Sequence, residues 1–111
     1  MELDVKTEQS GATCMISLTG EVDVYTSPRL KKELLDRIDA GCLDIVVELD
    51  ALGFIDSSGL GVLVSGLRHA KEHGGTLRLV CTNESILKIF RITGLDKVFP
   101  LFSTIEEARG F

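Results

Sequence analysis

Aromatic and basic residues are both scarce in this sequence. It has no Trp, one Tyr and five Phe, so few rings are available to stack on nucleic-acid bases. The 12 Lys and Arg residues are scattered and are outnumbered by 17 Asp and Glu residues, and the resulting net charge of −5 repels a phosphate backbone. Direct nucleic-acid binding is therefore not expected, and a protein is the more plausible partner.

Long apolar runs are also missing. No stretch approaches the ~20 apolar residues of a membrane span, and residues 1–6 have neither the basic start nor the apolar run of a signal peptide. We therefore expect a cytoplasmic protein that makes no membrane contact. The three cysteines, Cys14, Cys42 and Cys81, form no C-x-x-C pair and no cluster with histidine. Reduced thiols are the simplest prediction for all three, with Cys14 and Cys81 buried on apolar strand faces.

The composition is that of an ordinary globular domain. With 111 residues, 44% of them hydrophobic and 26% charged, the chain fits one domain over residues 1–111 with a single core. A chain of this length buries enough surface to fold without a metal or a disulfide. Stability therefore gives no reason to expect a cofactor, and none is predicted.

Apolar residues at a spacing of two predict the strands. Cys14, Ile16 and Leu18 alternate with polar residues and predict a strand over residues 12–19. Residues 44–49 are more continuously apolar and β-branched, as in a central strand covered on both faces. Further strands are predicted around 77–81, at Val98-Phe99 before Pro100, and at the edge over residues 2–7.

Apolar residues at helical spacing separate these strands. The pattern predicts helices over about 28–40, capped by Thr26 or Ser27, and over 60–73, ended by Gly74-Gly75. A third helix contains Ile86, Ile89 and Phe90 and ends at Gly94, and a fourth starts in the capping box Ser103 to Glu106. This order predicts an α/β fold, with a mixed and mostly parallel sheet of four to five strands and about four helices.

The segment Gly53 to Gly61 joins the central strand to the second helix and places polar groups at a helix N-terminus. Asp56, Ser57 and Ser58 supply one carboxylate and two hydroxyls there. The positive end of the helix tolerates an anion, and a phosphoryl group on Ser57 adds about −1.5 to −2 charges, enough to exclude a partner. The alternative is that Ser57 or Ser58 merely caps the helix. In that case Gly59, Gly61 and Gly66 only let the helix lie close to the sheet.

Two segments carry a family resemblance. Gly20-Glu21-Val22-Asp23, followed by the segment from Phe54 to Leu63, resembles the STAS domains of bacterial anti-sigma factor antagonists, and the likeness covers essentially the whole chain. The resemblance implies that Ser57, the first serine after the aspartate of a D-S-[ST]-G segment, is phosphorylated by the anti-sigma factor. It also implies a partner-binding surface formed by Asp23, Asp56, Ser58 and Gly59.

The function implied by this resemblance is partner switching. The unphosphorylated protein binds a kinase-type anti-sigma factor and frees its sigma factor, and phosphorylation abolishes binding until a serine phosphatase removes the group. Such a protein regulates transcription and is not itself an enzyme. The alternatives are a STAS scaffold subunit of a stress-sensing assembly and an accessory domain of a transport system.

Other catalytic and metal motifs are incomplete. Residues 69–73 match the H-x-x-E-H pattern of inverzincin metalloproteases, but no third ligand or cleft is evident, and a solvated helix end is the favoured interpretation. Gly66 comes too late for G-x-G-x-x-G, and Ser57 does not lie in G-x-S-x-G. Acid–base catalysis by Asp23 and Asp56 has no substrate pocket to support it. We therefore expect no metal site and no catalytic residue.

Overall fold

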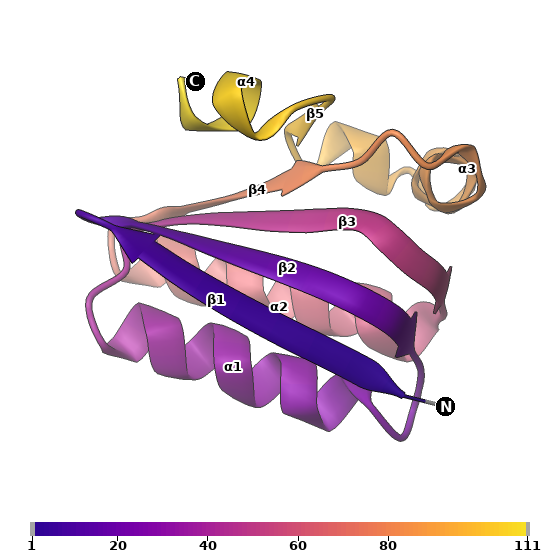
Figure 1. The fold of residues 1–111 in the computed structure, drawn as a ribbon, viewed down its shortest axis with the longest axis horizontal. Helices are drawn as coiled ribbons and strands as arrows, with labels where there is room; N and C mark the ends of the chain where they lie inside the picture. The colour runs from indigo at the N-terminus through magenta and orange to yellow at the C-terminus, as the bar shows by residue number, and fades with distance from the viewer. Residues whose placement is uncertain (1, 111) are drawn as a thin grey trace.

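Five strands form one mixed sheet in the order β1-β2-β3-β4-β5, in a computed structural model that describes residues 2–110 (Figure 1). β1 pairs with β2 in the antiparallel direction, and β2 to β5 run parallel. The strands are β1 (Leu3–Ser10), β2 (Thr13–Val22), β3 (Asp44–Ile55), β4 (Thr76–Val80) and β5 (Leu101–Phe102). The predicted α/β class with a mostly parallel sheet is confirmed.

Helices cover both faces of this sheet. On one face, α1 (Ser27–Asp39) and α2 (Ser57–Glu72) pack side by side, as Figure 1 shows. On the other face, α4 (Ile105–Arg109) packs over β3 and β4. The remaining helix, α3 (Glu84–Thr93), follows the end of β4, adds Ile86 and Phe90 to the core that α1 and α2 cover, and leads into a short 3₁₀ helix, Leu95–Lys97. None of the helices in residues 2–110 has the length and apolar character needed to cross a membrane.

The core follows the predicted periodicities. The alternating residues Cys14, Ile16 and Leu18 of β2 are buried. In the same layer lie the inner faces of the two long helices, Leu30, Leu34 and Ile38 of α1 and Leu60, Leu63 and Leu67 of α2. Val46 of β3 instead faces α4 and packs with Val80 and Ala108. The central strand is therefore covered on both sides, as its continuous apolar sequence predicts.

The C-terminal third differs from the prediction at two element boundaries. The last strand is Leu101–Phe102 and not Val98-Phe99, because Phe99 is a buried core residue and strand pairing begins only after Pro100. Proline has no N–H to donate, and Pro100 contributes its carbonyl oxygen, which accepts a hydrogen bond from Leu79 N at 3.1 Å.

The fourth helix begins one residue later than the predicted capping box. Its N-cap is Thr104, whose hydroxyl oxygen accepts a hydrogen bond from Glu107 N at 3.1 Å. The same hydroxyl lies 3.2 Å from Glu107 Oε1. The S/T-x-x-E relation therefore holds for Thr104 and Glu107, and not for Ser103 and Glu106.

The prediction of three reduced thiols is wrong for two of them. Cys14 on β2 and Cys42 before β3 form a disulfide, with Cα atoms 6.0 Å apart and a sequence separation of 28. Parallel pairing places Thr13 opposite Asp44 and so brings the two cysteines together, which sequence spacing alone does not reveal. Cys81 is a free, buried thiol, and burial raises its pKa.

Candidate functional site

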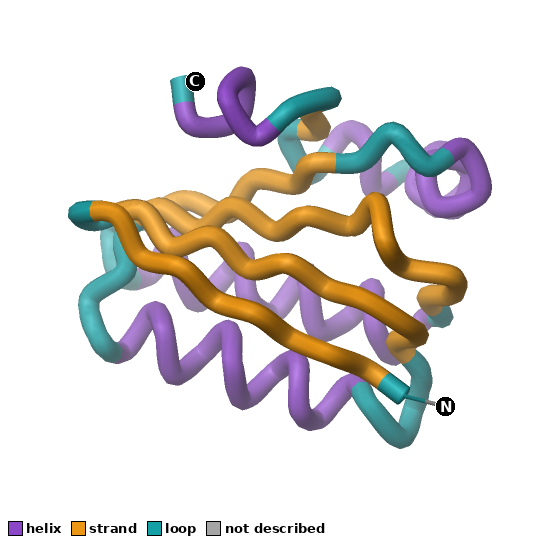
Figure 2. Tube along the Cα trace, in the orientation of Figure 1, coloured by secondary structure: helices purple, strands orange, loops and turns teal. Residues whose placement is uncertain are grey.

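Three loops meet at the carboxyl edge of the parallel strands, where α/β proteins usually place their sites. They follow β2, β3 and β4 and lie on the right of Figure 2. Asp56 N donates to Val22 O at 3.1 Å and ties the second loop to the first. Asn83 Nδ2 donates to Leu52 O at 3.1 Å and ties the third loop to β3.

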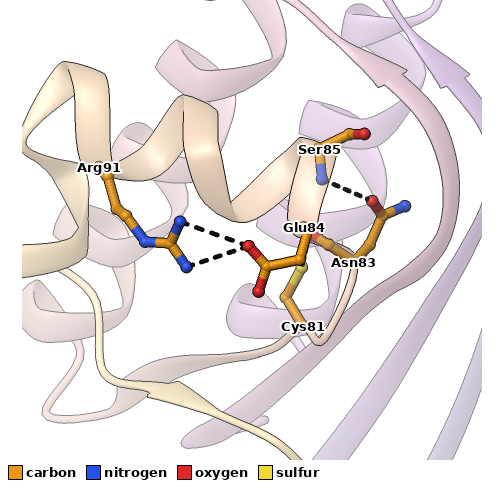
Figure 3. Close-up of polar contacts among 5 residues, drawn as sticks. All are labelled: Cys81, Asn83, Glu84, Ser85 and Arg91. Carbon is orange, nitrogen blue, oxygen red and sulfur yellow. Dashed lines mark hydrogen bonds and ion pairs between the residues drawn. The ribbon is translucent and has the colours of Figure 1, made fainter.

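The third of these loops forms the start of α3, drawn in Figure 3. The Asn83 side chain caps the helix by accepting a hydrogen bond from Ser85 N at 3.0 Å. Arg91 pairs with Glu84 at 3.4 Å along the exposed side of the same helix. Cys81 lies buried beneath this turn, with its sulfur 3.7 Å from the Asn83 carbonyl oxygen. These contacts fix the loop and keep the Cys81 thiol away from solvent.

Asp56 is the N-cap of α2. Its Oδ1 accepts hydrogen bonds from Ser58 N at 2.9 Å, from Gly59 N at 3.2 Å, and from the Ser58 hydroxyl. The Ser58 hydroxyl lowers the pKa of the Asp56 carboxyl most; desolvation opposes this, and the two backbone N–H groups add to the lowering. The alternative that Ser57 or Ser58 caps this helix is therefore wrong. Asp is as good a cap as Ser, and its position before the two serines was the available sequence signal.

Ser57 is the first residue of α2, and its side chain is exposed. Within residues 2–110, no hydrogen bond engages its hydroxyl, whereas the hydroxyl of Ser58 is bonded to Asp56. Two adjacent residues of the same type thus differ in availability. Only the Ser57 hydroxyl is both accessible and unengaged at the positive end of a 16-residue helix.

Gly59 allows the start of α2 to lie directly against the sheet. A Cβ atom at this position would stand 2.6 Å from Val22 Cγ1 and 2.8 Å from Ile55 Cγ1. Gly66 is also tight, at 3.1 Å from Leu34 Cδ1, whereas a Cβ at Gly61 would meet nothing within 4 Å. Close packing therefore explains Gly59 and Gly66 but not Gly61. Gly59 itself is buried and cannot contact a partner directly. It affects the partner-binding surface through the position that it gives the first turn of α2 and Ser57.

Asp23 shapes the loop between β2 and α1. It is only 5% exposed, and its Oδ1 accepts hydrogen bonds from the backbone N–H groups of Tyr25 and Thr26, both at 2.9 Å. Desolvation acts to raise the pKa of Asp23, but the bonds from Thr26 and Tyr25 outweigh it and lower the pKa. Thr26 is the N-cap residue of α1, as predicted, but its hydroxyl makes no capping bond to the helix and donates toward Asp23 and Glu21 O instead. Asp23 and Asp56 both support their loops, which does not suit proton transfer.

The Asp23 turn displays apolar side chains that sequence reasoning missed. Tyr25 is 87% exposed, Val24 is 62% exposed, and Phe54 on the adjoining strand is 40% exposed. Phe54 pairs in register with Glu21, at the end of β2 from which this loop leaves. We call Val24, Tyr25, Phe54 and Ser57 the carboxyl-edge surface. The sequence signal that could have predicted this exposure is the pair Val24-Tyr25 in a predicted turn, because turn residues are usually exposed.

Comparisons with known proteins agree in sequence and in fold. Residues 4–108 match the STAS domain. The chain is 31% identical over 106 residues to the anti-sigma-B factor antagonist of Bacillus subtilis strain 168, covering 96% of both chains. An anti-sigma factor antagonist from Mycobacterium paratuberculosis has a TM-score of 0.89 at 26% identity, covering 98% of this chain and 92% of the other. The anti-sigma factor antagonist SpoIIAA in its unphosphorylated form has a TM-score of 0.82 at 26% identity, covering 97% of this chain and 98% of the other. The similarity thus spans the whole domain.

Proposed function

This chain belongs to the STAS domain family and groups with its anti-sigma factor antagonists, and from that premise we propose a partner switch controlled at Ser57. The unmodified protein binds a kinase-type anti-sigma factor and so frees a sigma factor, and phosphorylation of Ser57 ends this binding. The observation that carries the proposal is the contrast between the exposed, unengaged hydroxyl of Ser57 and the bonded hydroxyl of Ser58. The structural relative SpoIIAA also takes an unphosphorylated and a phosphorylated form.

The surroundings of Ser57 support a switch that acts on binding and not on folding. The positive end of the α2 dipole favours an anion at this position, and the Ser57 side chain is exposed, so the fold tolerates the phosphoryl group. The apolar members of the carboxyl-edge surface, Val24, Tyr25 and Phe54, suit close contact with a protein. A phosphoryl group on Ser57 carries about −1.5 to −2 charges and disfavours that contact. A loss of about 2.7 kcal/mol of binding free energy is enough to weaken affinity 100-fold.

The remaining predicted residues act around this serine. Asp56 and Ser58 hold the first turn of α2, Asp23 holds the neighbouring loop, and Gly59 sets the depth of the helix start. In this proposal they form and orient the partner-binding surface, with Gly59 acting from below it. The chain itself catalyses no reaction, because the kinase and the phosphatase supply the chemistry. The switch acts in the cytoplasm, where sigma factors meet RNA polymerase.

Phosphate mapping and binding tests on serine variants examine the proposal. The protein is incubated with the anti-sigma kinase of its own host, ATP and Mg²⁺, and peptides are analysed by mass spectrometry. We expect one phosphate on Ser57, retained when the neighbouring hydroxyl is removed in the matched control Ser58→Ala. By calorimetry, Ser57→Ala binds the kinase like the unmodified protein, and Ser57→Asp binds about 10- to 100-fold more weakly. A phosphate on Ser58, or equal affinity of the two Ser57 variants, contradicts the proposal.

A further inference from the structure

The far end of α2 from Ser57 carries a second group of polar side chains. The 16 residues of this helix rise about 24 Å, so its last turn is remote from the carboxyl-edge surface. There His69 and His73, one turn apart, meet Asp39, the last residue of α1. These are the only two histidines of the chain. The proposed partner switch uses none of the three side chains.

The three side chains converge closely enough to share an ion. His69 Nε2 lies 2.8 Å and His73 Nε2 lies 3.8 Å from the same oxygen, Asp39 Oδ1. One ligand atom from each residue lies within 4.8 Å of the other two, and the two rings are 4.5 Å apart between centroids. Ligand atoms around a tetrahedral Zn²⁺ stand roughly 3.3 Å apart, so only small side-chain rotations are needed.

The histidine tautomer is already set for binding at one position. His73 Nδ1 lies 2.9 Å from the carbonyl oxygen of His69, and a carbonyl only accepts hydrogen bonds. The proton of a neutral His73 ring is therefore on Nδ1, which leaves a lone pair on Nε2, the atom that faces Asp39. Backbone carbonyls orient metal-binding histidines in this way in known sites. The side chains of Asp39, His69 and His73 are 59%, 27% and 43% exposed, so an ion reaches them from solvent.

We propose that Asp39, His69 and His73 form a binding site for a divalent transition metal ion, with Zn²⁺ as the best-suited ion. Two imidazole nitrogens and one carboxylate oxygen form a typical three-residue zinc ligand set, with water in the fourth position, whereas Mg²⁺ and Ca²⁺ prefer oxygen ligands. Asp39 is the third ligand that the pattern His69 to His73 lacks in sequence. The ion would join the C-terminal ends of α1 and α2. Within residues 2–110, the polar contact between these two helix ends is the one that Asp39 makes with the two histidines.

Zinc titration of matched variants tests the site. Protein without a histidine tag is treated with a chelator and titrated with ZnCl₂ by calorimetry, and its melting temperature is measured with and without the ion. We expect one Zn²⁺ per chain and a melting temperature that rises with zinc concentration, because the ion binds the folded state. His69→Ala, His73→Ala and Asp39→Asn each weaken binding at least about tenfold. Asp36→Asn removes an exposed carboxylate one turn earlier in α1, paired with Lys32, and leaves zinc affinity unchanged.

Two results overturn the proposal. One is zinc binding to the natural chain no stronger than to the double variant His69→Ala/His73→Ala. The other is an Asp39→Asn variant that binds Zn²⁺ as tightly as the natural chain, which leaves the three side chains as an ordinary interhelical contact. Circular dichroism confirms that the variants are folded. Because Ser57 lies at the other end of α2, either result leaves the proposed switch unaffected.

Discussion

At the scale of single residues, hydrogen bonding distinguishes two chemically identical side chains. Ser57 and Ser58 both follow Asp56, and their sequence offers either as a helix cap, while the family resemblance implies Ser57 as the acceptor of phosphate. The Asp56 carboxylate engages the hydroxyl of Ser58 and leaves that of Ser57 in solvent. The two serines differ because α2 begins at Ser57. The apolar periodicity predicted the start of this helix only near Leu60, so the sequence did not reveal the difference.

Two glycines of the same helix turn give a direct test of close packing. Gly59→Ala places a methyl group within 3 Å of Val22 and Ile55, so we expect a loss of about 1 to 3 kcal/mol of unfolding free energy from overpacking. Gly61→Ala meets nothing within 4 Å and raises helix propensity, so it stabilises by about 0.5 to 1 kcal/mol. Urea denaturation measures both. Equal effects of the two substitutions contradict the packing described for Gly59.

At the scale of elements, the ends of helices account for most differences between expectation and structure. The apolar periodicities correctly predicted α1, α2, α3 and the strands β1 to β4, because burial repeats over many residues of each element. An element end depends instead on one cap or one missing N–H. Asp56 and Thr104 are the N-cap residues at positions where neighbouring serines were expected to cap. The last strand begins after Pro100 and not before it.

The cap of α2 gives the protein an acid-sensitive element. The pKa of Asp56 is lowered from 3.8 in the folded state, so its carboxylate contributes stability above that value and loses it as the pH falls through the lowered folded pKa. We expect the urea midpoint to fall between pH 6 and pH 3. In Asp56→Asn this fall is smaller, because Asn caps without titrating, and the remainder includes Asp23, whose pKa is also lowered. An identical pH dependence of the two proteins argues against the cap.

At the scale of the whole molecule, the sheet topology brings together residues that sequence spacing keeps apart. Parallel pairing of β2 and β3 joins Cys14 to Cys42, and the side-by-side packing of α1 and α2 brings Asp39 to His69. Neither pair follows from local periodicity, because register across strands and helices decides both. The candidate site at the start of α2 could be identified from sequence because Asp56, Ser57 and Ser58 are contiguous.

The disulfide predicts a stability that depends on redox conditions. It links two residues with a sequence separation of 28, and the loss of chain entropy in the unfolded state is worth about 3 to 4 kcal/mol. Cys42→Ser is therefore expected to lower the free energy of unfolding by about that amount, and excess reductant in denaturant removes most of the difference from the natural chain. A thiol titration in guanidinium without reductant counts one free thiol, Cys81. Three free thiols contradict the disulfide.

The two outer strands of the sheet have a consequence for how this molecule meets others. An exposed strand edge is a template for joining a further strand. Here β1 carries the exposed, oppositely charged side chains Asp4, Lys6 and Glu8, and β5 is only two residues long. Mixed charges and a short edge strand both discourage edge-to-edge joining of sheets. The sheet edges thus disfavour partners that would extend the sheet, which fits the proposed switch, where side chains and loops make the contact and one phosphoryl group weakens it.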